Sequence, residues 1–529
     1  MNKEVLFGKE SRDKALAGVK KITDAVRVTM GAAGKCVLIG DSTYYDGFQI
    51  QLPTKVTKDG YTVTKHFELQ DAVENRGAML IKEAANKTVE QAGDATTCTC
   101  VLAESLISNG IKLIDEGANS QLLKKGMDAA LEYVVDELKK ISVPIKGDIE
   151  KIRQIATVSA NNDESVGNLI ADAFSKIGAD GIIDIEASKG VTTEIKISEG
   201  YKFDRGWISP LFVNNRDKQL WEVLDPLILL YEKRVTHHTQ VENACVLAMK
   251  AGKPLLIVCE DADENGLAFL AMNVAQGRIK VCAVKSPFGS TSREDMEDIA
   301  TLTGGVFICD SKGVGVKEVT MSDLGTAKKV IVSKNETVII GGNSDAEALT
   351  NLLNELRMNL AQAKDEEEKA PIEKRIAKLT GGVAVIQVGA ATETELNEKM
   401  DRVDDAVRAT KAAIAEGFVA GGGTAFLRIP FGGYDITSDF NKGKGLVFTA
   451  LESPLKQICK NAGTDVENIF KLVSEGKGNM GYNALTDEIV DMVEDGIIDS
   501  TKALRCALTN AVSVAGMLLT SECSIISIS

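Results

Sequence analysis

The stretch Gly-Asp-Ala-Thr-Thr at residues 93–97 is the part of the sequence around which we expect the rest of the chain to be organised. It stands directly before a helical pattern that carries Leu102, Leu106 and Leu113. We expect Asp94 to cap this helix by accepting a hydrogen bond from one of its first amides. Free amides and the positive dipole end of a helix bind phosphate, and a carboxylate beside them can hold magnesium. An ordinary helix cap has the same residues, so the rest of the chain must decide between the two.

Composition and charge restrict the class of protein. A chain of 529 residues is long enough for about three or four domains. Charged residues make up 26% and hydrophobic residues 44%, a balance typical of soluble globular domains. The net charge of −15 argues against nucleic acid as the main partner, because phosphate backbones favour basic surfaces. An acidic surface also suits a cavity that does not retain what it encloses.

Cysteine and histidine usage exclude several kinds of site. The ten cysteines form no Cys-x-x-Cys pair, so we expect reduced core residues in a reducing compartment. The chain has three histidines, His66, His237 and His238. This shortage argues against His-ligated zinc chemistry and against a Ser-His-Asp hydrolase. We expect the adjacent pair His237 and His238 to face solvent rather than to bind a metal.

Targeting signals are not evident in the sequence. The first residues, Met-Asn-Lys-Glu-Val, lack the apolar core of a signal peptide, and their acidic character does not suit a transit peptide. We expect no apolar run long enough to span a bilayer. The sequence therefore predicts a cytoplasmic protein with no membrane partner.

The pattern of apolar residues predicts a helical N-terminal part. We expect helices at 9–28, 71–87, 96–116 and 120–141, a buried strand at 36–39 and a hairpin within 40–53. The tetrapeptide Thr-Lys-Asp-Gly at 57–60 is predicted to be a tight hairpin turn.

The middle of the chain predicts an α/β region. From about residue 200 to 342 short apolar strands alternate with helical patterns. The expected elements are strands at 255–259, 279–284 and 305–309, helices at 240–251, 264–275 and 293–302, and a hairpin joining 330–332 to 337–340. A helix pair is expected at 345–379, followed by a glycine pair at 381–382 that could be a hinge or a plain turn. A helix at 393–416, a glycine-rich turn at 420–424 and an edge strand at 524–529 complete the prediction.

Eight motifs in order resemble one family over essentially the whole chain. They are Val-Thr-Met-Gly at 28–31, Thr-Lys-Asp-Gly at 57–60, Gly-Asp-Ala-Thr-Thr at 93–97, Val-Ser-Ala-Asn-Asn-Asp at 158–163, Phe-Asp-Arg-Gly at 203–206, Ala-Thr-Leu-Thr-Gly-Gly at 300–305, Ala-Gly-Gly-Gly at 420–423 and Gly-Tyr-Asn-Ala at 481–484. In this order they resemble the group I chaperonins, the GroEL family, in a divergent form.

The resemblance implies a multidomain fold, mainly α, with an inserted α/β domain. An equatorial ATP-binding and ring-contact domain would comprise 1–141 and 416–529. An intermediate hinge domain would comprise 142–198 and 384–415, and an apical domain that binds substrate and lid would comprise 199–383. The sequence independently suggests one part of this arrangement. Nucleotide-type turns occur before residue 100 and again after 420, with an α/β segment between them.

The resemblance also implies ATP, magnesium and potassium as ligands and assigns residues to an ATP site. Asp94 would hold magnesium, and Asp405 would orient the attacking water, with Asp59 as the second catalytic carboxylate. Phosphoryl transfer needs such charge neutralisation and alignment of the nucleophile. The remaining residues implied to contact the nucleotide are Thr29, Met30, Gly31, Ala32, Lys58, Ala95, Thr96, Thr97, Cys98, Gly422, Asn483, Ala484, Leu485 and Asp499.

The family also presents an exposed apolar groove for non-native chains in its apical domain. The residues at the matching positions are Trp207, Ser209, Leu211, Phe212, Leu267, Ala271 and Met272. The spacing of Leu267, Leu270, Ala271 and Val274 is by itself more typical of core packing. Flexible Met and Leu side chains suit promiscuous binding, so both interpretations stand at this point.

The sequence departs from the family pattern at the predicted sites. Ala32 stands where the family has proline, Ala95 where it has glycine, and Leu485 where it has alanine. If the backbone at residue 95 has a positive φ, alanine costs on the order of 1 kcal/mol there. On the first groove helix, Glu242 and Cys245 replace leucines, which bears on client and lid affinity.

The sequence thus predicts an ATP-driven chaperonin that captures non-native polypeptides and encloses them under a co-chaperonin lid. The expected assembly is a homo-oligomeric seven-membered ring, with two rings back to back. One alternative is a ring that holds clients but hydrolyses ATP weakly because of Ala32 and Ala95. A second is a small-molecule ATP-dependent enzyme on an unrelated α/β fold, although the chain has no Walker lysine motif.

Overall fold

The computed structural model describes residues 2–40, 42–45, 48–51, 54–145, 147–160, 162–178, 181–188, 190–198, 200–216, 218–289, 291–310, 315–343, 346–363, 366–380, 382–433, 435 and 437–528. The chain divides into two compact units. Unit 1 is Met1–Ser175, Ile185–Glu194 and Gln387–Ser529, so it contains both ends of the chain. Unit 2 is Lys176–Asp184 and Ile195–Ile386. The division into three domains stays a prediction.

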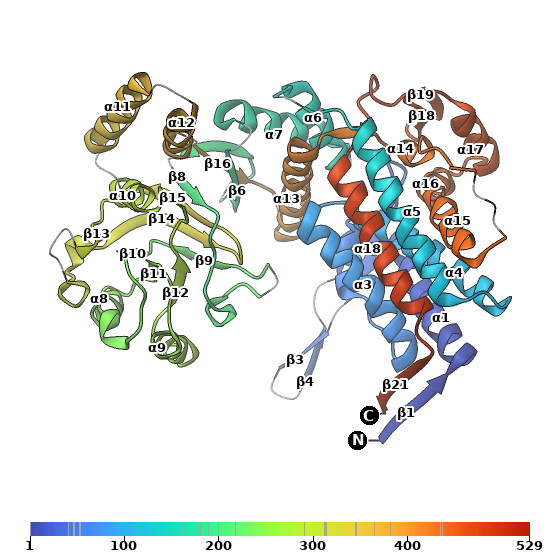
Figure 1. The fold of residues 1–529 in the computed structure, drawn as a ribbon, viewed down its shortest axis with the longest axis horizontal. Helices are drawn as coiled ribbons and strands as arrows, with labels where there is room; N and C mark the ends of the chain where they lie inside the picture. The colour runs from blue at the N-terminus through green and yellow to red at the C-terminus, as the bar shows by residue number, and fades with distance from the viewer. Residues whose placement is uncertain are drawn as a thin grey trace. The chain divides into compact units, whose positions relative to one another are not determined.

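Unit 1 is built mainly from helices. Its helices are α1 (Gly8–Arg27), α2 (Gly60–His66), α3 (Ala72–Ala92), α4 (Thr96–Asp115), α5 (Ser120–Ile141), α6 (Ile149–Ser159), α7 (Glu164–Ile177, reaching its boundary), α13 (Glu393–Glu416), α14 (Thr424–Leu427), α15 (Asp439–Leu451), α16 (Ser453–Ala462), α17 (Val466–Glu475) and α18 (Thr501–Leu519). Helices from both ends of the chain share one core, and Figure 1 shows the red α18 lying among the blue α3 and α4. Ile22, Leu102, Leu106 and Leu508 are completely buried in this core. Apolar burial of this kind is the main stabilising term for such a bundle.

Short two-stranded sheets fix the loops and ends of unit 1. The pairs, all antiparallel, are β1 (Asn2–Phe7) with β21 (Cys523–Ile528), β2 (Val37–Ile39) with β5 (Lys55–Thr57), β3 (Ser42–Tyr45) with β4 (Phe48–Gln51), β17 (Phe418–Ala420) with β20 (Ile498–Ser500), and β18 (Met480–Asn483) with β19 (Glu488–Asp491). The first pair joins the two ends of the chain, which lie together in Figure 1. The pair β17 and β20 brings the strand after α13 beside the strand before α18.

Unit 2 contains a mixed eight-stranded sheet. Its strands are β8 (Gly200–Phe203), β9 (Trp221–Leu224), β10 (Leu227–Tyr231), β11 (Leu255–Cys259), β12 (Val281–Lys285), β13 (Phe307–Ile308), β14 (Gly325–Val332) and β15 (Thr337–Gly342). The order is β12-β11-β10-β14-β15-β8, with β13 on β10 and β9 on β14. The strands β10, β11 and β12 are parallel. The sequence Leu-Leu-Ile-Val-Cys of β11 is buried throughout, as expected for a parallel strand covered on both faces.

Helices flank this sheet. They are α8 (Glu242–Ala251), α9 (Glu264–Ala275), α10 (Ser292–Thr303), α11 (Ala346–Gln362) and α12 (Glu366–Thr380), with short 3-10 turns η1 (Pro210–Phe212), η2 (His238–Gln240), η4 (Val316–Glu318) and η5 (Met321–Asp323). Two buried carboxylates of α10 bind basic side chains of α12. Arg375 donates two hydrogen bonds to Asp298, at 2.9 and 2.7 Å, and Lys378 donates one to Asp295 at 2.7 Å.

The chain passes from one unit to the other within the strands of a three-stranded sheet. This sheet is formed by β6 (Ile182–Ala187), β16 (Val383–Val388) and β7 (Glu194–Ser198), in the order β6-β16-β7. The glycine pair predicted to be either a hinge or a plain turn precedes β16, and its first member, at position 381, lies outside the described residues.

Most of the predicted elements are confirmed, but two predictions are wrong: the strand predicted to be buried at 36–39 forms with Leu38 exposed, and the stretch at 57–60 is not a hairpin turn. The Asp59 carboxylate accepts hydrogen bonds from the amides of Tyr61 and Thr62, at 3.0 and 2.7 Å, and so caps α2. The preceding strand β5 pairs instead with β2. Aspartate before glycine serves both turns and helix caps, and here the helix cap formed. The prediction of hairpins was right for β3 with β4 and for β14 with β15.

The predictions for cysteines, histidines and membrane spans need correction in detail. The ten cysteines are free thiols, but Cys36 is exposed and Cys523 is only half-buried. His237 is exposed, whereas His238 is half-buried with its ring 5.6 Å from that of Phe269. Among the described residues, α4 is long and apolar enough to cross a membrane, contrary to expectation. It is a core helix of unit 1, because more than half of its apolar window is buried there.

Candidate functional site

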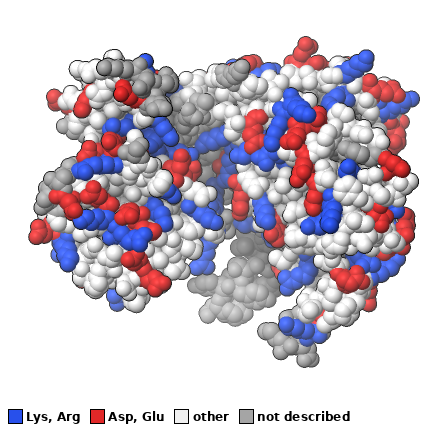
Figure 2. Space-filling model, in the orientation of Figure 1, with Lys and Arg blue, Asp and Glu red and all other residues white. Residues whose placement is uncertain are grey.

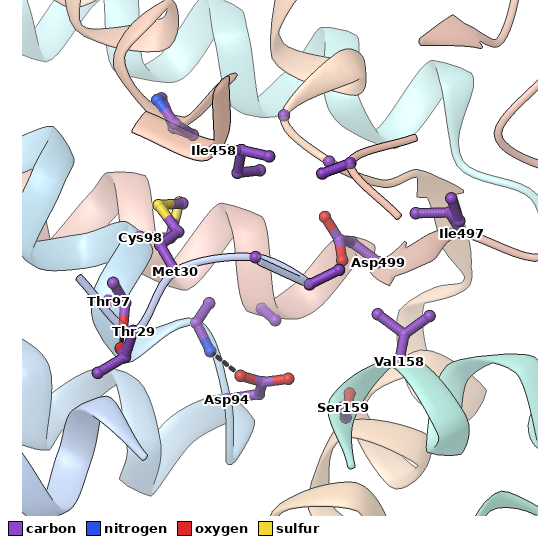
Figure 3. A pocket seen from close by; sticks show the side chains of 18 of the residues that line it. Thr29, Met30, Asp94, Thr97, Cys98, Val158, Ser159, Ile458, Ile497 and Asp499 are labelled. Carbon is purple, nitrogen blue, oxygen red and sulfur yellow. Dashed lines mark hydrogen bonds between the residues drawn. The ribbon is translucent and has the colours of Figure 1, made fainter. Parts of the chain in front are cut away.

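A cavity of about 260 Å³ lies in unit 1, and its walls come from both ends of the sequence. Figure 3 shows Thr29, Asp94 and Cys98 on one side and Val158, Ile497 and Asp499 on the other. Every residue predicted for the ATP site lines it: Thr29, Met30, Gly31, Ala32, Lys58, Asp59, Asp94, Ala95, Thr96, Thr97, Cys98, Asp405, Gly422, Asn483, Ala484, Leu485 and Asp499. The structure therefore brings together residues that are more than 400 positions apart, and their individual roles stay predictions.

The first wall is the turn that follows α1. Gly31 has φ +79°, a left-handed conformation that glycine adopts without strain. The amide of Lys35 donates to the carbonyl of Val28 at 2.7 Å and closes the turn. The Asn461 side chain donates to the carbonyls of Arg27 and Met30, at 2.8 and 2.9 Å. A helix from the C-terminal part thus holds a turn of the N-terminal part in place.

The second wall is the turn between α3 and α4. The chain leaves α3 at Gly93, with φ +76°, and enters α4 through Ala95, with φ +68°. The prediction that Asp94 is the N-cap of α4 is wrong. Ala95 occupies that position, and no side chain caps the helix there. The Asp94 carboxylate instead accepts a hydrogen bond from the Ala95 amide at 2.5 Å, the dashed line in Figure 3. The two turns meet where the hydroxyl oxygens of Thr29 and Thr97 lie 3.2 Å apart.

The third wall comes from the strands β17 and β20. Asp499 lies on β20 opposite Val419. Two glycines with positive φ, Gly422 and Gly423, follow β17. A Cβ atom on Gly422 would come within 2.8 Å of the Met492 side chain, so glycine keeps this side of the cavity open.

The hairpin of β18 and β19 supplies the residues predicted for the base. The Asn483 side chain donates to Asp495 at 2.6 Å and accepts from the Leu485 amide at 2.9 Å. These bonds hold the loop of Ala484 and Leu485 in one conformation. Arg428 supports the same hairpin by donating to the carbonyl of Met480, at 2.5 Å. The side chain of Leu485 is 64% exposed, so its bulk does not fill the cavity.

The helix α13 carries Asp405 to the cavity. Burial raises the pKa of Asp405 well above its usual range, and the charges of Asp59, Asp94 and Asp404 raise it further. Arg408, one turn along the same helix, opposes this rise. Burial likewise raises the pKa of Asp94, with Asp59 contributing, while hydrogen bonds from Ala95 and Ser159 lower it.

A fourth carboxylate completes the negative wall of the cavity. Burial, with the charge of Asp94 beside it, raises the pKa of Asp499 to about 7. Asp94, Asp405 and Asp499 are each half-buried, and all three line the cavity. Lys58 also lines the cavity and donates to the Ala32 carbonyl at 3.3 Å. An excess of buried carboxylates over basic side chains favours a cation as a ligand.

The chemistry of these residues fits magnesium. The described part of the chain holds no cluster of three or more His, Cys, Asp or Glu side chains placed to bind a metal alone. Magnesium in nucleotide sites is commonly held by one or two carboxylates together with phosphate oxygens. Asp94 provides a carboxylate of this kind beside two turns rich in backbone amides.

Several residues of the cavity had been assigned no role from the sequence. They are the polar residue Ser159 and an apolar wall formed by Val158, Phe426, Pro454, Ile458, Tyr482, Met492 and Ile497. Ser159 and Val158 belong to one of the eight motifs, and Figure 3 places Ser159 opposite Asp94. Tyr482 likewise belongs to a motif, the one at 481–484, and these motifs were the available signal. The other apolar residues lie in segments whose pattern indicates only core packing.

The residues predicted for an exposed apolar groove in unit 2 do not all face solvent. Leu211 is 63% and Met272 is 59% exposed. Trp207, Leu267 and Ala271 are half-buried, and the first two of these pack against the core of the unit. The prediction is wrong for Phe212, which is 1% exposed in that core, and for Ser209, which is buried and caps η1. In the turn η1 successive side chains point in different directions, so Leu211 and Phe212 cannot both face outward.

Comparisons with known proteins agree with the fold. The family model of the TCP-1/cpn60 chaperonin family matches residues 22–528. The chain is also similar to a solved structure of the chaperonin gp146 from the bacteriophage EL 2 (Pseudomonas aeruginosa), in the presence of ATP-BeFx. In crystal form II the identity is 21%, the match covers 99% of each chain and the TM-score is 0.69. In crystal form I the identity and coverage are the same and the TM-score is 0.63. At this identity the likeness shows the fold alone.

Proposed function

This chain belongs to the TCP-1/cpn60 chaperonin family, and we propose that it is an ATP-hydrolysing chaperonin that captures non-native polypeptides and encloses them for folding. The observation that carries the proposal is the cavity of unit 1, which is lined by two amide-rich turns, one of them carrying Asp94, together with Asp59, Asp405 and Asp499. The crystals of gp146 were obtained in the presence of ATP-BeFx, which supports a nucleotide as the ligand of this fold.

Different residues of the cavity have different roles in ATP hydrolysis in this proposal. The turns of Thr29–Ala32 and Thr96–Cys98 bind phosphate oxygens through amides and hydroxyls, and Lys58 adds positive charge. Asp405 orients the attacking water, with Asp59 beside it. Asp94 holds magnesium, which when bound supplies charge neutralisation for phosphoryl transfer. Potassium remains an expectation from the family resemblance.

The ribose and base occupy the other end of the cavity in this proposal. Asp499 accepts hydrogen bonds from the ribose hydroxyls. The apolar wall that includes Ile458 and Ile497 packs against the base, and Asn483, through its fixed loop, sets the position of Ala484 and Leu485. Apolar walls with a few placed polar groups are typical of small-molecule sites.

Client capture takes place on unit 2 in this proposal. Leu211 and Met272 offer apolar surface that a non-native polypeptide can bury, at roughly 25 cal/mol per Å². We propose a ring of seven copies, paired back to back, closed by a co-chaperonin lid. The mixed charge on the face drawn in Figure 2, with acidic and basic side chains interspersed, suits soluble clients rather than nucleic acid.

A second function, a ring that holds clients with weak ATP turnover, is favoured by one observation. Ala95 is held in a left-handed conformation, and its amide is occupied by Asp94 at 2.5 Å. An amide engaged in this way is less available to a phosphate oxygen. This candidate predicts tight client binding with little hydrolysis.

Steady-state ATP hydrolysis and client refolding separate the two functions. The chaperonin proposal predicts magnesium-dependent hydrolysis that Asp405→Asn abolishes while ATP still binds, together with ATP-dependent refolding of a denatured client. Client binding without hydrolysis would support the second function. Light scattering tests the ring, and a monomeric protein would contradict both.

A further inference from the structure

Arg408 lies one turn beyond Asp404 on α13 and is fixed to it by two hydrogen bonds. Its Nη2 atom is 2.8 Å from Asp404 Oδ2 and its Nε atom is 3.3 Å from Oδ1. A two-point contact of this kind sets the direction of the guanidinium group as well as its distance. Asp405, the residue expected to orient water, is the next residue after Asp404 on this helix.

The stem of Arg408 packs directly on the turn that carries Asp94. A Cβ atom placed on Gly93 would lie 2.0 Å from the Arg408 Cβ and 3.0 Å from its Cγ and Cδ atoms. The backbone of Gly93 is therefore in van der Waals contact with the arginine, and only glycine leaves the space. Gly93 ends α3 with φ +76° and is followed at once by Asp94.

Arg408 is also a basic group whose charge acts on Asp405. The acidic groups around Asp405 are Asp59, Asp94 and Asp404. Without a nearby cation, the repulsion of Asp405 by Asp59 and Asp94 would push α13 away from the turn at Asp94. Arg408 attracts Asp404 and Asp405 on its own helix while its stem rests on Gly93.

We infer that Arg408 is a positioning residue that holds Asp405 on α13 in register with the Asp94 turn of the nucleotide cavity. This inference rests on the proposed function, because it concerns the geometry of ATP hydrolysis. Arg408 does not line the cavity, so it acts through Asp405 and Gly93 rather than by touching substrate. A displacement of about 1 Å at a catalytic group can cost up to roughly 100-fold in rate.

Arg408→Met tests the inference, because methionine keeps an unbranched stem against Gly93 and removes the charge and both hydrogen bonds. We expect kcat for ATP hydrolysis to fall at least about tenfold, with ATP affinity in equilibrium binding unchanged within roughly threefold. Arg408→Lys, which keeps stem and charge, should retain more activity than Arg408→Met. The double variant with Asp404→Asn should be no slower than Arg408→Met alone, since both remove one contact.

Arg505→Met is the matched control. Arg505 binds Glu416 at the end of the same helix through two hydrogen bonds, at 2.9 and 2.6 Å, with similar partial exposure, yet lies outside the cavity lining. We expect this control to keep kcat even if it lowers stability. An Arg408→Met enzyme with the kcat of the wild type, or an equal loss in Arg505→Met, would overturn the inference. If the wild type hydrolyses ATP and Asp405→Asn does not, such a result leaves the proposed function intact. If the wild type does not hydrolyse ATP, both fail.

Discussion

Replacing Ala95 by glycine is expected to stabilise the turn that carries Asp94. Ala95 has φ +68° and ψ +23°, a left-handed conformation that places its Cβ too close to the following carbonyl. This conformation costs a non-glycine residue about 1–2 kcal/mol. Glycine removes that cost but has more freedom in the unfolded chain, which returns roughly 0.5–1 kcal/mol. We therefore expect Ala95→Gly to stabilise the start of α4 by about 0.5–1 kcal/mol.

Hydrogen exchange is the assay, because the effect is local and the protein has two units. At about 1 kcal/mol, amide exchange at the start of α4 should slow roughly fivefold under conditions in which local opening limits exchange. Gln219→Gly provides the control, since Gln219 also has a positive φ, +54°, but lies in unit 2. The control should leave exchange in α4 unchanged. Faster or unchanged exchange in Ala95→Gly would refute the reasoning that Ala95 is strained.

Three further predictions concern pH, a buried ion pair and the exposed apolar surface. Because the pKa of Asp499 is raised, the folded protein binds more protons than the unfolded chain between pH 3.8 and about 7. The free energy of unfolding without nucleotide should therefore fall as the pH rises through that window. Urea titrations should show a shallower fall in Asp499→Asn. Arg375→Met leaves the fully buried Asp298 without its partner and should cost about 3–5 kcal/mol of unfolding free energy, a cost that a conserved urea midpoint would disprove. Met272→Ser should weaken suppression of client aggregation without loss of stability, whereas Phe212→Ala should cost about 3–5 kcal/mol. Equal stability losses in both would contradict the assignment of exposed and buried positions.

The sequence predicted the elements of the fold well where periodicity is strong. The helix at 393–416 begins and ends at the predicted residues, because a long amphipathic pattern is closed by Gly417 with φ +83°. Errors arose where one residue type serves two structures. Asp59 caps a helix rather than a hairpin, and Asp94 bonds to the Ala95 amide without being the N-cap. Such choices are made by tertiary contacts that short patterns do not contain.

The residues of the site were predictable only where a motif marks them. All of the residues matched to the family pattern for ATP line one cavity. Most of the apolar wall, including Ile458 and Met492, was not predicted, since these residues come from separate segments whose pattern indicates a core. In unit 2, apolar residues at helical spacing can form either a groove or a core, so the spacing does not decide between them. The structure buries Phe212 and exposes Met272. Side-chain direction in short turns was not available from spacing.

The measurement that bears most directly on the account is equilibrium binding of ATP with magnesium to the wild type, Asp94→Asn and Asp499→Asn. The two variants change single carboxylates from opposite ends of the sequence that face the same cavity. The account predicts that the wild type binds one ATP per chain and that each variant lowers the affinity at least about tenfold, a loss of about 1.4 kcal/mol. ATP binding that is equally tight in all three proteins, or absent from the wild type, would contradict it.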